Sequence, residues 1–192
     1  MSNLNTTPKR IIIGISGASG AIYGIELLKA LQEAKIETHL VVSKTAQITI
    51  AQETPYSLPK VHEFATYVHS ASDLAASISS GSFKTNGMIV APCSVRSLAE
   101  IATGNTSTLL TRAADVIIKE QRRLVLMVRE TPLHSIHLRN MMTLADMGVV
   151  IAPPVPAFYS KPISLHEMTM HTVGRMLDLF DIEHNLIKRW GS

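Results

Sequence analysis

The stretch "IIIGISGASGAIYG", residues 11–24, decides the fold of this chain. Its β-branched run, Ile11–Ile13, predicts a buried strand, and apolar residues at helical spacing over 20–34 predict a helix. The three glycines between them, spaced G-x-x-G-x-x-G, predict a tight turn that leads from the strand into the helix. Such a turn binds a phosphate group in many α/β proteins, because unpaired backbone amides gather where the helix begins.

The same turn differs from those of two common nucleotide-binding classes. A dinucleotide site would have G-x-G-x-x-G and an acidic residue at the end of the second strand to bind a ribose, and this chain has neither. A P-loop would continue into G-K-[ST], which is also absent. The hydroxyls of Ser16 and Ser19, together with free amides at the start of the helix, suit a single phosphate monoester. A tight turn that binds no ligand remains the alternative.

Short apolar strands and amphipathic helices alternate along the rest of the chain. Strands are expected at 37–42, 87–92, 124–128 and 149–154. Helices are expected from Ser43 onward and at 94–102, 107–122, 134–147 and 164–180. Strands without a polar face are typical of a parallel sheet covered by helices on both sides. We therefore predict a single-domain, three-layer, doubly wound α/β sandwich of the flavodoxin-like or Rossmann-like type. Residues 54–86 show no strong strand, and we expect loops there and one helix at 72–79.

The composition indicates a compact protein with small ligands. The 192 residues suffice for one well-buried core and are rather short for two. Hydrophobic residues make up 46% and charged residues 17% of the chain, and nine residues are methionine, which suggests that other subunits cover part of the surface. The net charge of +3 is spread along the sequence, which favours small anionic ligands over nucleic acid.

The cysteine content and the N-terminal sequence bear on the compartment. Cys93 is the single cysteine, so an intramolecular disulfide is excluded and a reducing compartment is indicated. No apolar run approaches the roughly 18 residues of a membrane span, and the N-terminus lacks the apolar segment of a signal peptide. We expect a cytoplasmic protein with neither membrane nor nucleic acid as a partner, in which Cys93 is a small core residue.

Polar and charged residues follow the predicted strands, at the edge where ligands bind in a doubly wound sheet. Arg129 and Glu130 end an apolar strand there, and they offer a bidentate phosphate contact and a general acid or base. Arg112 and Lys119 lie seven residues apart on one face of a predicted helix. Taken alone, these two side chains are better explained as a solvated helix face that pairs with nearby carboxylates.

Long motifs in a fixed order resemble the UbiX-type flavin prenyltransferases across residues 9–191. They are "GISGASGAIYG", "VSKTA", "APCSVRSL", "LLTRAADVIIKE", "LVLMVRETPLH", "PPVPAFYSKP" and the "RW" near the end. The resemblance implies a flavodoxin-like subunit in a dodecamer with active sites at subunit interfaces. It also implies transfer of the dimethylallyl group of dimethylallyl monophosphate to N5 and C6 of reduced FMN, with release of phosphate. The product, prenylated FMN, would serve a UbiD-type decarboxylase in ubiquinone biosynthesis or in aromatic acid breakdown.

The resemblance also implies the site residues by position. The flavin would contact Gly17, Ala18, Ser19, Ser43, Ser94, Val95, Arg96, Ser97 and Arg129. The prenyl phosphate would contact Arg112, Lys119, Arg129, Tyr159, Arg175 and Trp190, with Arg112 supplied by a neighbouring subunit. The catalytic residues would be Ser19, Glu53, Lys119 and Glu130. No metal is implied, and His134 and His137, which share a helical turn, lack a third ligand.

The same resemblance sets the expected boundaries. Residues 1–8 would form a flexible tail, residues 9–182 the flavin-binding domain, and residues 183–192 a C-terminal tail that packs on a neighbouring subunit. Two other functions remain open. A related flavoprotein could decarboxylate a peptidyl cysteine or an aromatic acid, although "APCSVR" differs from the "PASANT"-like loop of the cysteine decarboxylases. A non-catalytic flavin store is the second, and the additional cationic residues argue against it.

Overall fold

A computed structural model describes residues 9–187 and 189 and shows one six-stranded, fully parallel sheet. The strand order is β3-β2-β1-β4-β5-β6. The strands are β1 (Arg10–Ile15), β2 (Glu37–Val42), β3 (Tyr67–His69), β4 (Gly87–Cys93), β5 (Arg123–Val128) and β6 (Val150–Ile151). The order reverses direction between β1 and β4, so the predicted doubly wound fold is confirmed, in its 3-2-1-4-5-6 variant.

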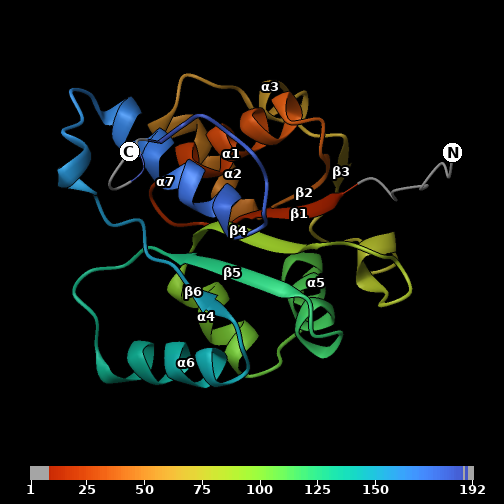
Figure 1. The fold of residues 1–192 in the computed structure, drawn as a ribbon. Helices are drawn as coiled ribbons and strands as arrows, with labels where there is room; N and C mark the ends of the chain where they lie inside the picture. Colours follow the sequence, from red (N-terminus) through yellow and green to blue (C-terminus); the bar gives the residue numbers. More distant parts are fainter. Residues whose placement is uncertain (1–8, 188, 190–192) are drawn as a thin grey trace, which may run out of the picture.

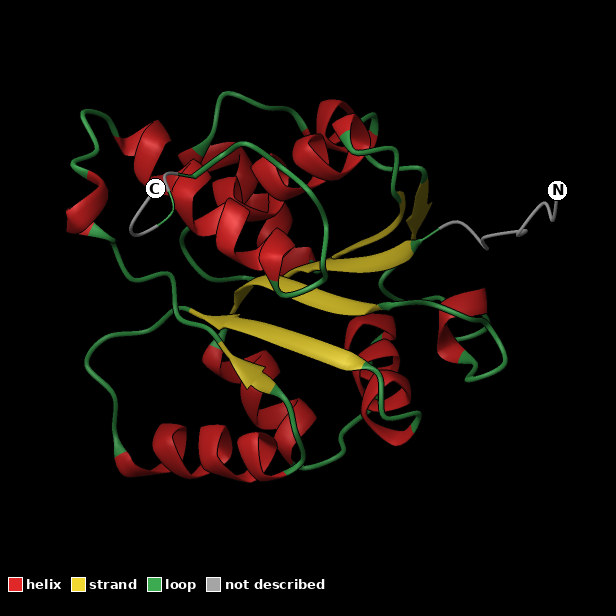
Figure 2. Ribbon diagram, in the orientation of Figure 1, coloured by secondary structure: helices red, strands yellow, loops and turns green. Residues whose placement is uncertain are grey.

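Helices cover both faces of the sheet, as Figures 1 and 2 show. One layer contains α1 (Ala21–Glu33), α2 (Lys44–Glu53), α3 (Leu58–His62) and α7 (Leu165–Asp178), and the other contains α4 (Val95–Ala102), α5 (Leu109–Lys119) and α6 (Ser135–Asp146). Ile11 and Ile13 of β1 pack under the first layer, whereas Ile12 packs under the second. The apolar run that opens the sequence therefore supplies both halves of the core.

Most helices begin at the polar residues that the sequence offers as caps. Ser43 accepts a hydrogen bond from the backbone N–H of Ala46, and Ser164 accepts one from that of Glu167. The strand expected at 149–154 is shorter than predicted, because Pro153 and Pro154 have no N–H to donate to a neighbouring strand. No helix in the described part of the chain is long and apolar enough to cross a bilayer.

The segment 54–86 differs from the prediction. The prediction of a helix at 72–79 was wrong, since only a 3₁₀ turn, η1 (Ser77–Ser79), forms there. Upstream of it, Asp73 accepts a hydrogen bond from the N–H of Ala75 through its own side chain. Such local side-chain bonds compete with helix formation. The short helix α3 and the strand β3 in this segment were not predicted.

Strand β3 was missed because it is three residues long, lies at an edge and exposes Tyr67 and Val68. Its attachment to β2 involves polar side-chain contacts, whereas the longer strands of the sheet bury apolar faces. Nδ1 of His39 lies 2.9 Å from Nε2 of His69, and Nε2 of His39 lies 3.0 Å from a carboxylate oxygen of Glu37. Burial lowers the pKa of both histidines, although Glu37 counteracts this at His39.

The C-terminal segment packs on its own subunit as far as it is described. A Cβ placed on Gly174 of α7 would lie 2.5 Å from Cγ2 of Ile187, so this segment lies directly against the helix. Residues 1–8, 188 and 190–192 fall outside the described residues, and with them the predicted N-terminal tail. Packing of the C-terminal tail on a neighbouring subunit stays a prediction.

Acid should weaken the attachment of β3. The pKa of His39 in the folded state lies below 6.5, the value expected for the unfolded chain. As the pH falls below about 6.5, the unfolded chain therefore binds more protons at His39 than the folded chain does. The stabilisation is complete above that pH and is lost as the pH falls toward the lowered pKa. Urea unfolding between pH 7.5 and 5 should therefore show a smaller loss of stability in His39→Gln than in the wild type. The exposed His166→Gln serves as the control and should follow the wild type; equal pH slopes in all three proteins would contradict this role of His39.

Candidate functional site

The main cavity lies at the carboxyl ends of β1, β2, β3 and β4, across the point where the strand order reverses. Its volume is about 780 Å³, which suits a cofactor-sized ligand. Hydroxyl side chains dominate its polar wall: Ser43, Thr45, Ser70, Ser72, Ser94, Ser97, Ser107 and Thr108. Two cations, Lys44 and Arg96, lie among them. Arg96 pairs at 2.8 Å with the carboxylate of Glu100 in the same wall, so Lys44 is the cation of the wall that makes no ion pair within residues 9–187 and 189. The cavity therefore offers hydrogen-bond donors and positive charge to a polar, anionic ligand.

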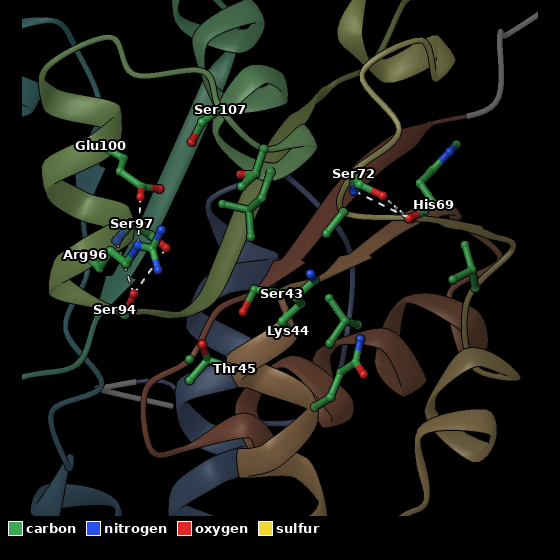
Figure 3. Close-up of a pocket in the computed structure, with 18 of the residues that line it drawn as sticks. Ser43, Lys44, Thr45, His69, Ser72, Ser94, Arg96, Ser97, Glu100 and Ser107 are labelled. Carbon is green, nitrogen blue, oxygen red and sulfur yellow. Dashed lines mark hydrogen bonds and ion pairs between the residues drawn. The ribbon is translucent and has the colours of Figure 1, made fainter.

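Two helices begin at this cavity, and Figure 3 shows their first residues on different sides of it. Ser43 caps α2, with Lys44 and Thr45 next to it. Ser94 caps α4, where its hydroxyl accepts from the N–H of Ser97 at 3.2 Å. The start of a helix carries partial positive charge, and Lys44 adds a full charge beside α2. The start of α2 is therefore suited to a phosphate group.

The two serines of the first turn have different surroundings. The hydroxyl of Ser16 is fully buried, donates to the carbonyl oxygen of Pro92 at 2.9 Å and accepts from the N–H of Ser94 at 2.7 Å. It therefore joins the end of β1 to the end of β4 and is not available to a ligand. Ser19 is half-buried in the same turn, so it remains the candidate ligand of the two.

Glu53 occupies the place where the sequence predicted a phosphate. Its carboxylate accepts the N–H of Gly20 at 2.7 Å, directly before α1. The Glu53 carboxylate would repel a phosphate at this point, and one fewer backbone amide would be free to bind that phosphate. The expectation that the first turn binds a phosphate is thus disfavoured, and the start of α2 is the better place for it.

Gly17 allows the first turn to touch α2. A Cβ on Gly17 would lie 2.4 Å from Cβ of Thr45, so any side chain there would push the two segments apart. This close approach brings Gly17 and Ser43 into one wall of the cavity, together with Ser94–Ser97 from the opposite side. Ala18 and Ser19 belong to the same turn without lining the cavity of the single chain.

Arg129 and Glu130 lie at the same edge of the sheet, directly after β5. The N–H of Arg129 donates to the carbonyl oxygen of Cys93 at 3.0 Å, and the Glu130 carboxylate accepts the N–H of Thr131 at 2.9 Å. Burial raises the pKa of Tyr23 in the first turn of α1, and the positive charge of Arg129 counteracts that rise. The start of α1 thus has the Glu53 carboxylate at the amide of Gly20, directly before the helix, and the charge of Arg129 near Tyr23.

Arg112 and Lys119 lie outside the cavity, on α5. Arg112 pairs with Asp115 at 2.9 Å and Lys119 with Glu120 at 2.7 Å, as expected for a solvated helix face. The beginning of α5 lines the cavity at Leu110, but Lys119 ends the helix about 14 Å further along its axis, toward the opposite edge of the sheet. A single chain therefore does not bring Lys119 to the site.

Tyr159 contacts α7 from outside the helix, and Arg175 belongs to it. Tyr159 lies on the turn η2 (Phe158–Ser160), with its hydroxyl 3.1 Å from Nε2 of His171. Arg175, one helical turn beyond His171, contacts Asp178 at 2.7 Å. Both lie outside the wall of the main cavity, and Trp190 lies outside the described residues. The cavity of the single chain thus gathers six of the nine residues expected for the flavin, Gly17, Ser43 and Ser94–Ser97, and none of the described residues expected for the prenyl phosphate.

The sequence missed several residues of the cavity wall. Lys44 and Thr45 are adjacent to Ser43 and were recognisable by their place at the end of a strand. Ser70 and Ser72 could not be recognised, because they reach the cavity only through the unpredicted pairing of β3. Cys93 is fully buried in the core, which confirms its interpretation as a small core residue, and this burial raises its pKa to about 12. The rings of His134 and His137 stack at 3.5 Å, and no group of three metal-ligating side chains occurs in the described part.

Comparison with known proteins identifies close relatives. The family described as Flavoprotein matches residues 1–191. A probable UbiX-like flavin prenyltransferase of Bacillus subtilis is 56% identical over 183 residues, which cover 95% of this chain and 90% of the relative. The crystal structure of AnUbiX (PadA1) in complex with FMN and dimethylallyl pyrophosphate is 51% identical, with a TM-score of 0.95 over 96% of this chain and 98% of that chain. A structure from Escherichia coli O157:H7, described as a dodecameric FMN-dependent UbiX-like decarboxylase, is 50% identical with a TM-score of 0.93, over 95% of this chain and all of that chain.

The two serines of the first turn should respond differently to substitution. Ser16→Ala leaves the buried N–H of Ser94 and the carbonyl of Pro92 without this partner, which should lower the free energy of unfolding by about 1–3 kcal/mol. Ser19→Ala is the matched control and should change stability by less than about 0.5 kcal/mol. Urea unfolding of both variants provides the measurement. Equal stability of the two variants would show that the Ser16 hydroxyl does not hold the strand ends together.

Proposed function

The chain belongs to the family of UbiX-type flavin prenyltransferases, and we propose that it joins the dimethylallyl group of dimethylallyl monophosphate to reduced FMN. The observation that carries this proposal is the cavity at the strand ends, where hydroxyls, Lys44 and the start of α2 converge. The product would be FMN prenylated at N5 and C6, with inorganic phosphate as the second product.

The flavin fits the half of the site that one chain builds. Ser43, Lys44 and Thr45 would hold its phosphate at the start of α2, since this is the cationic helix start of the cavity. The ring would contact the first turn at Gly17–Ser19, the start of α4 at Ser94–Ser97, and Arg129 after β5. These three segments lie at the ends of β1, β4 and β5, which are neighbours in the sheet.

The prenyl phosphate needs the second half of the site. A phosphate monoester carries up to two negative charges near neutral pH, and Lys119, Arg129 and Arg175 would neutralise them as the phosphate leaves. Tyr159 would donate a hydrogen bond to it, and Trp190 would lie beside the prenyl chain. These side chains supply by themselves the positive charge that a metal ion would otherwise provide.

A neighbouring subunit would supply part of this second half. Arg112 and Lys119 share one rigid helix, α5, so both would come from the same neighbour and not Arg112 alone. Large apolar side chains lie exposed on the connection before α7, with Phe158 75% and Ile163 89% accessible, and on α6, with Met142 67% accessible. Exposed apolar surface of this extent supports association into an oligomer. We propose the dodecamer that is described for the Escherichia coli O157:H7 relative.

Two carboxylates, Glu53 and Glu130, are the proposed groups for proton transfer. Glu53 is held at the start of α1 and Glu130 follows β5, so both lie at the edge of the sheet where the flavin would lie. Closing the second bond on the flavin ring releases a ring proton, which one of these carboxylates or the departing phosphate would accept. Ser19, in the first turn, would contact the reacting groups.

The product would serve a UbiD-type decarboxylase, with ubiquinone biosynthesis as the proposed pathway. A second candidate function is decarboxylation by the chain itself, because the Escherichia coli O157:H7 relative is described as a decarboxylase. The two functions differ in the fate of FMN. A prenyltransferase changes the mass of the flavin, whereas a decarboxylase returns it unchanged.

The flavin extracted after reaction decides between these functions. Incubation with reduced FMN and dimethylallyl monophosphate should raise the mass of the extracted flavin by one isoprene unit and release phosphate. Oxidised FMN and the omission of the donor are the controls, and dimethylallyl diphosphate in a parallel sample tests the preferred donor. Unchanged FMN with both donors would reject the proposed function, and unchanged FMN with carbon dioxide released from an aromatic acid would support the decarboxylase.

A further inference from the structure

Three side chains converge on the carboxylate of Asp178, the last residue of α7. One carboxylate oxygen lies 2.7 Å from Nη1 of Arg175. The other lies 3.0 Å from Nε2 of His184 and 2.9 Å from Nη2 of Arg189, whose Nη1 lies 3.3 Å from the first oxygen. Both oxygens of Asp178 therefore accept hydrogen bonds, and the carboxylate joins the end of α7 to the segment that follows it.

The carboxylate of Asp178 is fixed from two directions. It belongs to α7, and the segment after the helix packs directly on α7, since a Cβ on Gly174 would lie 2.9 Å from Cε1 of the buried His184. Burial raises the pKa of Asp178, but hydrogen bonds from Arg189 and His184 outweigh this effect and hold the pKa below its usual value. Asp178 is therefore a fixed anion near neutral pH.

The pair between Arg175 and Asp178 differs from an ordinary pair on a helix surface. Lys60 and Glu63 have the same spacing of three residues, and both of their side chains are more than half exposed. The Asp178 side chain is only 16% exposed, whereas that of Arg175 is 53% exposed. A pair exposed on both sides orients neither partner firmly, because both side chains keep their freedom in water. In the second pair, the buried Asp178 is the fixed point and orients the exposed guanidinium.

Arg175 retains most of its hydrogen-bond donors. Its Nη1 contacts Asp178, and within residues 9–187 and 189 its side chain has no other partner. A guanidinium has five N–H groups in one plane, so the remaining edge can donate two parallel hydrogen bonds to a phosphate. Arg175 and Arg189 together outweigh the single carboxylate by one positive charge. The cluster therefore still attracts an anion, although Asp178 lies within it.

We propose that Asp178 is a positioning residue for the transfer reaction: its carboxylate holds the Arg175 guanidinium in the orientation that binds the phosphate of the prenyl donor. This inference rests on the proposed function, which places Arg175 at that phosphate. Asp178 would not itself contact the donor. Its effect should therefore require the Arg175 guanidinium, should concern the prenyl donor, and should leave FMN binding unchanged.

A double-mutant cycle on the assembled enzyme tests the proposal through donor binding alone. Because the proposed reaction needs reduced FMN, enzyme loaded with oxidised FMN is titrated with dimethylallyl monophosphate in a calorimeter. Arg175→Ala should weaken donor binding at least about tenfold, and Asp178→Ala about three- to tenfold. The double variant should bind the donor no more weakly than Arg175→Ala alone. The affinity for FMN, measured by fluorescence titration, should be the same in every variant.

Two further variants serve as controls. Asp178→Asn removes the charge and keeps one acceptor oxygen, so its donor affinity should lie between those of the wild type and Asp178→Ala. His184→Leu removes another partner of the same carboxylate and leaves Arg175 in contact with it, so its donor affinity should stay within about twofold of the wild type. With reduced FMN, Asp178→Ala should raise KM for the donor and leave KM for reduced FMN unchanged.

The proposal is overturned if Asp178→Ala binds the donor as tightly as the wild type or more tightly, since the carboxylate then does not orient Arg175 or opposes the phosphate. It is also overturned if Asp178→Ala weakens donor binding further in the Arg175→Ala background, or if His184→Leu is equally impaired. The carboxylate would then act through the segment after α7 and not through Arg175.

Two other outcomes would reject the role as well. A parallel loss of FMN affinity would show that Asp178 is needed for packing, and equal donor affinities of Asp178→Asn and Asp178→Ala would show that its acceptor oxygen does not hold Arg175. Should Asp178→Ala fail to fold, Asp178→Asn replaces it in the cycle, and its loss of donor affinity should likewise vanish in the Arg175→Ala background.

The same data separate this inference from the proposed function. If the wild type prenylates FMN and Arg175→Ala weakens donor binding without coupling to Asp178, only the role of Asp178 is rejected. If Arg175→Ala leaves donor binding unchanged, Arg175 does not contact the prenyl donor, and both its placement and the role of Asp178 are rejected. If the wild type leaves FMN unchanged, the proposed function itself fails.

Discussion

The buried hydroxyl of Ser16 joins the two strand ends between which the cavity opens. It donates to Pro92 and accepts from Ser94, so the end of β1 and the end of β4 are held at hydrogen-bond distance where the sheet order reverses. Ser94 in turn caps α4, and Gly17, the residue after Ser16, touches the start of α2 at Thr45. The Ser16 side chain thus helps to set the spacing of the cavity walls from the first turn, α2 and α4, together with the backbone bond from the N–H of Ser16 to the carbonyl oxygen of Pro92.

The sequence predicted the parts of the fold that follow from local physical chemistry. The apolar strands β1, β2, β4 and β5 and the Ser43 cap formed close to the expected positions, because strand burial and capping act over a few residues. It failed at β3, which is held by long-range polar contacts such as that between His39 and His69. The Ser70 and Ser72 hydroxyls were consequently missed at the cavity.

The candidate site was likewise predictable where its residues follow a predicted strand, and not where they depend on contacts between distant segments. Gly17, Ser43 and Ser94–Ser97 were assigned by resemblance to motifs of the flavin prenyltransferases, each of which follows a strand, and the parallel sheet brings them together in one cavity. The roles of Ser16 and Glu53 depend on contacts between distant segments, with Pro92 and with Gly20, and no sequence spacing indicated them. The position of Lys119 at the far end of α5 became evident only once the helix direction was known.

One chain builds the half of the site that we propose for the flavin, and the cations of α5 would complete the site from a neighbouring subunit. Mixed oligomers test this directly: Glu53→Gln and Lys119→Ala subunits, each inactive alone, should recover part of the prenyltransferase activity when they are co-assembled, because some interfaces combine an intact Glu53 with an intact Lys119. Arg112→Ala mixed with Lys119→Ala should recover none, since every α5 then carries a defect. Recovery in the second mixture, or none in the first when mass measurement confirms mixed oligomers, would contradict a site shared between subunits through α5.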